Sequence, residues 1–200
     1  MYIHFQSLKT SLLLGFVTFL AVLGSSYVLY SYTFTVLEKD LEEYLTGIVY
    51  TVTQRVDGDL HRTFTSRDQE TSPEYLNQIA ELGQVQKLFK NAKYVYTCIL
   101  KDGQVYFVLD PTPPGVIENG VETKSHIMDE YEEANEMPAL LDALKNQKAV
   151  FEKRPSTDRW GSFVSAYMPF YDSAGSFVGV AAVDMYSEDF AARIATIQRA

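Results

Sequence analysis

The chain has 200 residues, of which 46% are hydrophobic, and a formal net charge of −9 at pH 7. Apart from one membrane span, this length suits a single domain with a sizeable core. The acidic balance argues against nucleic acid as a partner, because nucleic-acid binders are usually basic. The only cysteine, Cys98, excludes an internal disulfide. It lies in an apolar run and is interpreted as a buried small hydrophobe.

An uncharged apolar segment lies between Lys9 and Glu38. A helix needs about 20 mostly apolar residues to cross a membrane, so this segment is long enough. We expect a cytoplasmic tail over 1–10 and a transmembrane helix over 11–34. A cleaved signal sequence is the alternative, with Gly24-Ser25-Ser26 as its cleavage site, but hydrophobicity resumes directly afterwards and favours an uncleaved span. Lys9 and Lys39 flank the span and nearly balance the positive-inside count.

Two helices are expected next. Apolar residues recur every three to four positions from Leu37 to Leu60, which predicts a helix that continues the span to about Phe64. Ser72-Pro73 then gives an N-cap and a proline at the first helical position, which predicts a second helix to about Asn91. The stripe on the first helix would pack on the domain or form a parallel homodimer, and the sequence leaves both open.

The second half of the chain has the signals of an antiparallel sheet. Strands are expected over 94–100, 105–110, 149–152, 162–171 and 176–185. Asp102-Gly103 is a strong hairpin signal between the first two. The stretch 111–136 is irregular, and loops of this length are usually functional or disordered. Short helices are expected over 137–147 and from Ser187. The order predicts an α+β fold with a five-stranded antiparallel sheet and helices on one face.

The sequence offers little for catalysis. Its three histidines are scattered, and it has no HExxH motif, nucleophile elbow or phosphate-binding glycine loop. We therefore expect no enzyme activity in these residues, no metal and no cofactor. The acidic run 129–133 beside His126 is interpreted as a solvated turn rather than a cation site, because the spacing of oxygen ligands is absent.

A binding site is better supported. Asp184 ends an apolar strand, where a carboxylate is costly unless it is paired. Its partner would be a ligand amine or a group of the protein, and both remain open. Trp160 is either a lid or a core residue, and Arg159 beside it suits a small anionic or zwitterionic ligand. Strand alternation predicts that six residues converge on one cavity beneath the loop 111–136: Tyr106, Asp110, Trp160, Ser165, Tyr167 and Asp184.

Three segments resemble bacterial Cache sensor domains, which have a PAS-like fold: Tyr106–Gly115, Thr157–Pro169 and Phe177–Asp184. The resemblance implies one sensor domain over 35–188, held outside the inner membrane as the input of a diguanylate cyclase, histidine kinase or chemoreceptor. It also implies that 189–200 is a helix leading towards a second span. In the amino-acid-binding subset an Arg-x-Trp arrangement is present. Arg159 and Trp160 are adjacent here, so amino-acid specificity is not carried over.

The sequence thus predicts a small-molecule sensor of a transmembrane signalling protein. Ligand binding would shift the equilibrium between two arrangements of loop and sheet, and this would bias the helix that enters the membrane. The alternative is a membrane-tethered binding protein that acts through a partner and has no output domain of its own.

Overall fold

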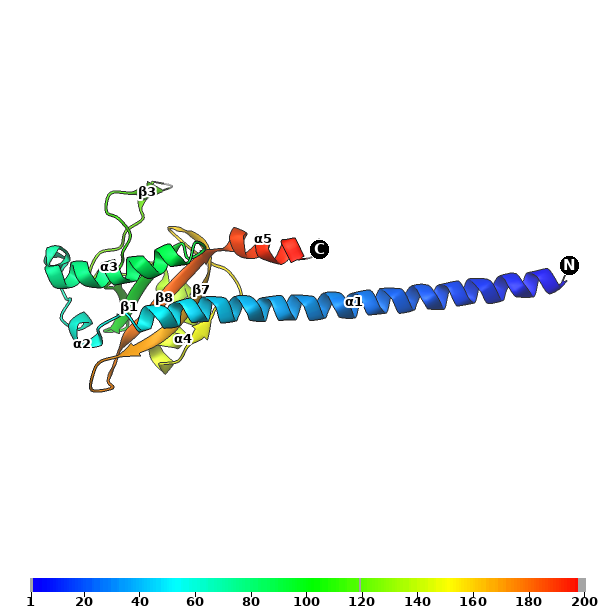
Figure 1. Cartoon of the computed structure of the whole chain (residues 1–200), viewed down its shortest axis with the longest axis horizontal. Helices are drawn as coiled ribbons and strands as arrows, with labels where there is room; N and C mark the ends of the chain where they lie inside the picture. Colours follow the sequence, from blue (N-terminus) through cyan, green and yellow to red (C-terminus); the bar gives the residue numbers. More distant parts are fainter. Residues whose placement is uncertain (1, 119, 198–200) are drawn as a thin grey trace. The chain divides into compact units, whose positions relative to one another are not determined.

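The computed structural model describes residues 2–118 and 120–197 (Figure 1). Its contacts divide the chain into two compact units, Met1–Asp40 and Leu41–Ala200, which are considered separately. Helix α1, Tyr2–Thr53, forms the first unit and continues into the second. Helix α5, Ser187–Ile197, occupies most of the expected C-terminal helix, and residues 198–200 of that expectation lie outside the described residues.

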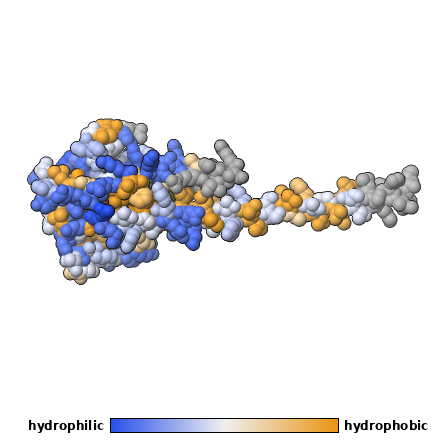
Figure 2. Space-filling view, in the orientation of Figure 1, coloured by the Kyte–Doolittle hydropathy of each residue, from blue (hydrophilic) through white to orange (hydrophobic). Residues whose placement is uncertain are grey.

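In the first unit, α1 is long and apolar enough to cross a membrane. Its large apolar side chains from Leu12 to Tyr32 are exposed, as Figure 2 shows along the rod. The hydroxyls of Thr18 and Ser25 donate to the carbonyls of Leu14 and Ala21, each at 2.9 Å. These polar groups are therefore satisfied within the helix, as a hydrocarbon environment requires. The expected span 11–34 lies inside this helix.

In the second unit, the last turns of α1 bury Leu41, Leu45, Ile48 and Val52. The helix ends at Thr53, eleven residues before the expected end at Phe64. A separate short helix, α2 (Gly58–His61), follows, and the Asp57 side chain caps it by accepting from the Leu60 amide. A Cβ on Gly58 would lie within 2.3 Å of the Tyr171 carbonyl oxygen. The apolar stripe does not reveal this close backbone approach, which requires a glycine at position 58.

The remaining helices are short. The 3₁₀ turn η1 is Arg67–Thr71, and α3 is Pro73–Leu88 with the predicted Ser72 cap, whose hydroxyl accepts from the Tyr75 amide at 3.2 Å. The 3₁₀ turn η2, Glu132–Glu136, leads into α4, Pro138–Asn146. The predicted Ser72 cap and Pro73 position of α3 are therefore confirmed, and α4 lies within the expected helix 137–147.

The main sheet is antiparallel and contains β1 (Tyr94–Lys101), β2 (Gln104–Phe107), β5 (Val150–Phe151), β6 (Ser156–Asp158), β7 (Gly161–Tyr171) and β8 (Phe177–Tyr186). Five strands lie in the order β2-β1-β8-β7-β5, and β6 pairs with β7. Asp102 and Gly103 have φ angles of +52° and +86°, which suits the predicted tight hairpin turn. The α+β class and the five predicted strands are confirmed.

Three details differ from the sequence-based expectation. The sheet has a sixth strand, β6, and the irregular stretch contains a small hairpin of β3 (Ile117–Glu118) and β4 (Val121–Glu122). Helices lie on both faces of the sheet rather than one. Helix α4 packs Leu140 and Leu144 against the face that carries Tyr96 and Phe107, which we call the pocket face. On the opposite face, His61 of α2 hydrogen-bonds to Thr97 at 2.8 Å.

Candidate ligand-binding site

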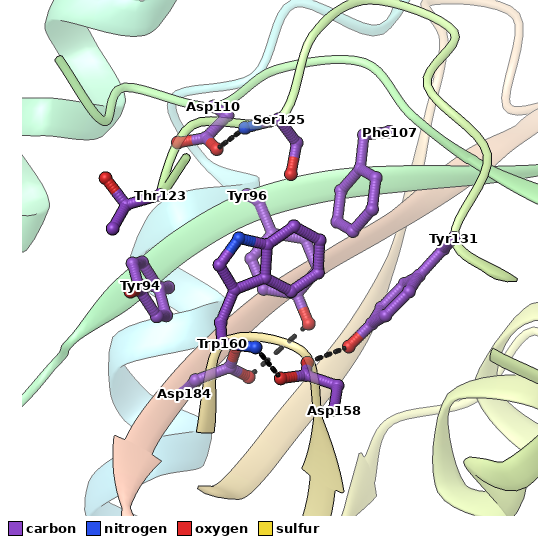
Figure 3. Close-up of a pocket in the computed structure, with 10 residues that line it drawn as sticks. All are labelled: Tyr94, Tyr96, Phe107, Asp110, Thr123, Ser125, Tyr131, Asp158, Trp160 and Asp184. Atoms are coloured by element: carbon purple, nitrogen blue, oxygen red, sulfur yellow. Dashed lines mark hydrogen bonds between the residues drawn. The ribbon is translucent and has the colours of Figure 1, made fainter. Parts of the chain in front are cut away.

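A cavity of about 20 Å³ lies on the pocket face (Figure 3). Strands β1 and β8 form its floor. The long loop after β2 (111–136) and the β6–β7 turn lie over the cavity, and we call these two segments the cover. In Figure 3 the Trp160 indole lies in the middle, with Asp158 and Asp184 on one side of it and Asp110 and Ser125 on the other. The lining residues are Tyr94, Tyr96, Phe107, Asp110, Thr123, Ser125, Tyr131, Asp158, Trp160 and Asp184.

A β-bulge decides which side chains after β2 point inward. Thr97 of β1 faces two residues, because Val108 N donates to the Thr97 carbonyl at 3.0 Å and Thr97 N donates to the Leu109 carbonyl at 2.9 Å. One extra residue on one strand reverses the alternation beyond it. Phe107 and Asp110, three residues apart, therefore both line the cavity. Simple alternation from Tyr106 to Asp110 does not hold here.

Three of the six residues expected at the site line this cavity: Asp110, Trp160 and Asp184. Tyr106 does not line it, and its hydroxyl donates to the Gln104 side chain at 2.8 Å. Ser165 and Tyr167 are buried in β7 and also do not line the cavity. Ser165 lies directly opposite Asp184 in the β7–β8 register. It therefore lies beside Asp184 on the same face of the sheet, outside the cavity lining.

Two of the three carboxyl groups at the cavity are engaged by neighbouring backbone. Asp110 accepts from the amides of Thr112 at 2.8 Å and Ser125 at 2.7 Å. Asp158 accepts from the Trp160 amide at 2.8 Å and from the Tyr131 hydroxyl at 2.6 Å. Both side chains thus hold the covering segments in place. Burial raises the pKa of each carboxyl, and these hydrogen bonds oppose the rise.

Asp184 is the carboxyl with the most acceptor capacity left for a ligand. Its residue is only 4% exposed. The Tyr96 hydroxyl donates to its carboxyl group at the long distance of 3.4 Å, and Ser165 lies opposite it in the β7–β8 register. Burial raises the pKa of Asp184 well above its usual range, and the charges of Asp158 and Glu152 raise it further. A positive group beside Asp184 would compensate the cost of its buried charge.

Five of the ten residues that line the cavity are aromatic. Phe107 packs against Tyr131 with ring centroids 4.5 Å apart, and Trp160 lies 5.6 Å from Phe107 and 5.8 Å from Tyr131. The buried Tyr94 hydroxyl has no hydrogen-bond partner among the described residues. A buried hydroxyl of this kind calls for a partner, which a bound polar molecule can supply. The cavity is therefore suited to a molecule with both apolar and polar groups.

No lysine, arginine or histidine is among the described residues that line the cavity. Arg159, the cation expected beside the ligand, instead forms a bidentate pair with Glu133, with nitrogen–oxygen distances of 2.7 to 3.2 Å. Its guanidinium lies 4.9 Å from the centroid of the Trp160 ring. Arg159 therefore stabilises the cover and is not positioned as a ligand contact.

Three side-chain contacts join the β6–β7 turn to the long loop, and we call them the clasp. The Trp160 indole N–H donates to the Glu122 carbonyl at 2.8 Å. The second contact is the bond from Tyr131 to Asp158, and the third is the pair between Arg159 and Glu133. The clasp closes the cover over Asp184.

Sequence reasoning missed several lining residues. Tyr94 shares the strand alternation of Tyr96 and could have been found from it, and Asp158 directly precedes the Arg-Trp pair. Phe107 depends on the bulge, and Tyr131, Thr123 and Ser125 lie in the irregular stretch. There, no periodic pattern reports which side chains face the sheet.

The acidic run beside His126 takes part in structural contacts. His126 lies 2.8 Å from Glu70, Glu130 accepts from Gln104, and Glu133 pairs with Arg159. Within 2–118 and 120–197, no group of three potential metal-binding side chains comes together. The cavity around Asp184 is thus the better candidate site.

Comparison with known proteins gives structural neighbours only. No protein-family model and no curated protein sequence matches the chain. Among solved structures, the sensory domain of the Campylobacter jejuni chemoreceptor Tlp3 with isoleucine bound is 17% identical over 82% of this chain, with a TM-score of 0.43. The ligand-binding domain of the Pseudomonas aeruginosa amino acid chemoreceptor PctC with GABA is 19% identical over 80%, with a TM-score of 0.44.

The periplasmic sensory domain of the Campylobacter jejuni chemoreceptor Tlp1 is 15% identical over 78% of this chain, with a TM-score of 0.45. The chain spans 66%, 60% and 59% of the length of the Tlp3, PctC and Tlp1 structures. All three are sensory or ligand-binding domains of chemoreceptors.

Proposed function

We propose that the chain is the ligand-sensing input of a membrane signalling protein and that its ligand is a small molecule with an ammonium group. One observation carries this proposal. The buried Asp184 carboxyl lies in a cavity walled by the rings of Tyr94, Tyr96, Phe107, Tyr131 and Trp160. The faces of aromatic rings attract cations, most strongly where water is excluded. A carboxylate and several rings together select a positive group.

The acidic residues that line the cavity help to decide between the anionic and the zwitterionic ligand expected from the sequence. A purely anionic ligand would approach three carboxyl groups, those of Asp110, Asp158 and Asp184, while Arg159 is paired with Glu133. Like charges in a buried site repel strongly. The ammonium end of a zwitterion, or a simple amine, meets the opposite situation at Asp184. We therefore favour a cationic or zwitterionic ligand over an anionic one.

The size of the cavity supports a mechanism of opening and closing. A volume of about 20 Å³ holds roughly one water molecule. A larger ligand needs the clasp to open or the indole to move aside. Ligand binding would then shift the population between a closed and an open cover. Helix α1 continues from the sensor domain into the apolar segment, so it is the part of the chain through which such a shift would be transmitted.

For the whole chain, we propose a single-pass anchor over 11–34 in the inner membrane and a sensor domain over 35–188 outside it. Any catalytic output would be separate from these residues. The face of α1 around 38–45 that is not occupied by the buried Leu41 and Leu45 is the proposed contact of a homodimer. Single cysteines placed along 38–45 should then crosslink with helical periodicity in membranes, and uniform absence of crosslinks would refute the dimer.

A charge-matched ligand panel tests the function. Trp160 is the only tryptophan, so its fluorescence reports directly on the site. Methylammonium, ethanolammonium and choline, together with zwitterionic amino acids, should shift the fluorescence and raise the unfolding temperature of the full chain in nanodiscs. Acetate and succinate should not.

Asp184→Asn should weaken binding of the cations by roughly ten- to a hundredfold, the effect of losing one charge-assisted hydrogen bond. Asp142→Asn is the matched control, because Asp142 lies on α4 and pairs with Lys148 away from the cavity. Equal binding by both variants, or binding of the anions alone, would overturn the proposal.

A further inference from the structure

A buried threonine joins the two faces of the sheet. Thr97 of β1 is 0% exposed, and strand alternation places its side chain on the face opposite the cavity. Its hydroxyl oxygen accepts from the Leu109 amide at 2.9 Å and lies 2.8 Å from Nε2 of His61. One hydroxyl therefore connects α2 on the far face with the segment that leads to Asp110 at the cavity.

The Leu109 amide belongs to the bulge opposite Thr97. A bulge disrupts the ladder of hydrogen bonds, and a buried amide needs a partner. Leu109 is 0% exposed, so its amide bonds to the Thr97 hydroxyl rather than to water. Asp110 directly follows Leu109, and the bulge turns it into the cavity. Thr97 thus helps to position Asp110, although Thr97 does not line the cavity itself.

Asp110 in turn holds the long loop of the cover. Its carboxylate accepts from the amides of Thr112 at 2.8 Å and Ser125 at 2.7 Å. The ammonium group of buried Lys124 donates to the Asp110 carbonyl. Three donors of the loop therefore converge on one residue. The place of the loop depends on Asp110, and the place of Asp110 depends on the bulge.

His61 fixes the other end of this connection. Residues 54–57 join the end of α1 to α2, and the His61 ring packs edge-to-face on Phe170 of β7 with centroids 4.8 Å apart. Burial lowers the pKa of His61 to about 3, so the ring is neutral at neutral pH and one of its nitrogens accepts. With that nitrogen at Nε2, the Thr97 hydroxyl accepts from Leu109 and donates its single proton to His61.

We propose that His61 and Thr97 are positioning residues of the ligand site and link the cover to the end of α1. This inference rests on the proposed function for the movement of the cover. When the cover closes on a ligand, it holds Asp110 and the bulge, and the Thr97 hydroxyl then holds His61 and α2 in one position. Coupling between two sites is reciprocal. A change at α2 should therefore also alter the affinity for the ligand.

A merely structural role of the threonine predicts a different result. If its hydroxyl only stabilised the fold, its loss would loosen the whole sheet, including the centres of β7 and β8. The proposed link instead confines the effect to the bulge, the cover and α2. Hydrogen exchange measures local opening segment by segment, so it separates the two cases.

The first arm needs no ligand and uses the full chain in nanodiscs. His61→Leu removes the ring nitrogens, whereas His61→Gln keeps a polar group for Thr97. Without its partner the hydroxyl loses its fixed direction, so exchange in 107–112 should become about fivefold faster in His61→Leu, the effect of one buried hydrogen bond. His61→Gln should stay near the wild-type rate, and β7 and β8 should not change. Equal rates in 107–112 for His61→Leu and wild type overturn the inference.

If His61→Leu does not fold, Thr97→Val takes its place and exchange of α2 becomes the readout. Thr97→Val removes the hydroxyl and keeps the shape of the side chain, and Thr97→Ser restores the hydroxyl. Exchange in α2 should be faster in Thr97→Val and close to the wild-type rate in Thr97→Ser. An α2 that exchanges alike in both variants overturns the inference.

The second arm compares methylammonium chloride with sodium chloride at equal ionic strength. Methylammonium should slow exchange in the cover and in α2 of the wild type and of Thr97→Ser. In Thr97→Val it should slow exchange in the cover alone, and its affinity should fall about tenfold. Thr63→Val is the matched control, because the exposed Thr63 hydroxyl donates to the Leu60 carbonyl at 2.7 Å and does not touch the bulge. This control should behave as the wild type.

The outcomes separate the two proposals. If methylammonium protects the cover but not α2 of the wild type, or protects α2 equally in Thr97→Val, the inference is overturned and the proposed function stands. If methylammonium and its larger analogues do not bind, the proposed function fails, and the exchange measured without a ligand alone decides whether His61 and Thr97 form the link.

Discussion

Replacement of Glu152 by glutamine should stabilise the domain, and the gain should depend on pH. The pKa of Glu152 is raised from 4.5 to about 7, chiefly by burial. Below pH 4.5 the acid is protonated in both the folded and the unfolded chain, so it has no effect on stability. As the pH rises towards 7, only the unfolded chain ionises freely, and the folded state becomes relatively less stable.

The expected gain in unfolding free energy follows from the two pKa values. A difference of about 2.5 pKa units corresponds to at most about 3 kcal/mol of unfolding free energy above pH 7. Glutamine keeps an oxygen that accepts from Ser156 but has no charge to bury. For a domain of this size, about 3 kcal/mol corresponds to a rise in melting temperature of roughly 6–12 °C. Near pH 4.5 the variant and the wild type should melt together.

Thermal unfolding of the full chain in nanodiscs, followed by Trp160 fluorescence from pH 4.5 to 8.5, measures this difference. Glu136→Gln is the matched control, because Glu136 is exposed at the end of η2. Its melting temperature should follow that of the wild type at every pH. A Glu152→Gln gain that is the same at pH 4.5 and pH 8 would show that burial of the charge is not the cause.

Three further predictions concern acid stability, a tight contact and topology. Burial lowers the pKa of His61 from 6.5 to about 3, so the folded state binds fewer protons than the unfolded chain. Its unfolding free energy therefore falls by about 1.4 kcal/mol for each pH unit below pH 6.5. Acid denaturation of His61→Gln should begin at lower pH than that of the wild type, and an unchanged midpoint would contradict this. Gly58→Ala should destabilise the domain by about 1–3 kcal/mol, because the new Cβ meets the Tyr171 backbone. Gly47→Ala is the control and should not destabilise it, because position 47 has open space around it. Equal melting temperatures of the two variants would refute the contact. Reporter fusions after Tyr94 should show phosphatase activity and no cytoplasmic fluorescence, and the reverse pattern would place the domain inside the cell.

Local signals in the sequence predicted much of the fold. The Asp102-Gly103 turn, the Ser72-Pro73 helix start and the apolar strand that carries Asp184 each depend on a few neighbouring residues, so they are visible in the sequence. The close approach of Gly58 to the distant Tyr171 backbone was not visible there, because it arises only in the folded chain. Sequence patterns report local preference, and they contain no record of which backbones approach one another in space.

The candidate site was predicted less completely, for the same reason. Asp184 and Trp160 stand out because a charge in an apolar strand and an indole beside an arginine are unusual in themselves. Tyr106 was assigned to the wrong side of β2, since the bulge opposite Thr97 is set by pairing with β1. Tyr131 reaches the cavity from an irregular loop, where position along the chain gives no information about direction.

The clasp has a kinetic consequence. It joins two covering segments by an indole hydrogen bond, a tyrosine–aspartate bond and an arginine–glutamate pair. In the proposed mechanism, a ligand larger than a water molecule reaches Asp184 only after the clasp opens or the indole moves aside. If opening precedes binding, the observed association rate rises with ligand concentration only until it equals the opening rate, and then becomes constant. Trp160→Phe removes the indole bond and raises this limiting rate. The duration of a response would then be governed by the closing and reopening of the cover rather than by diffusion of the ligand.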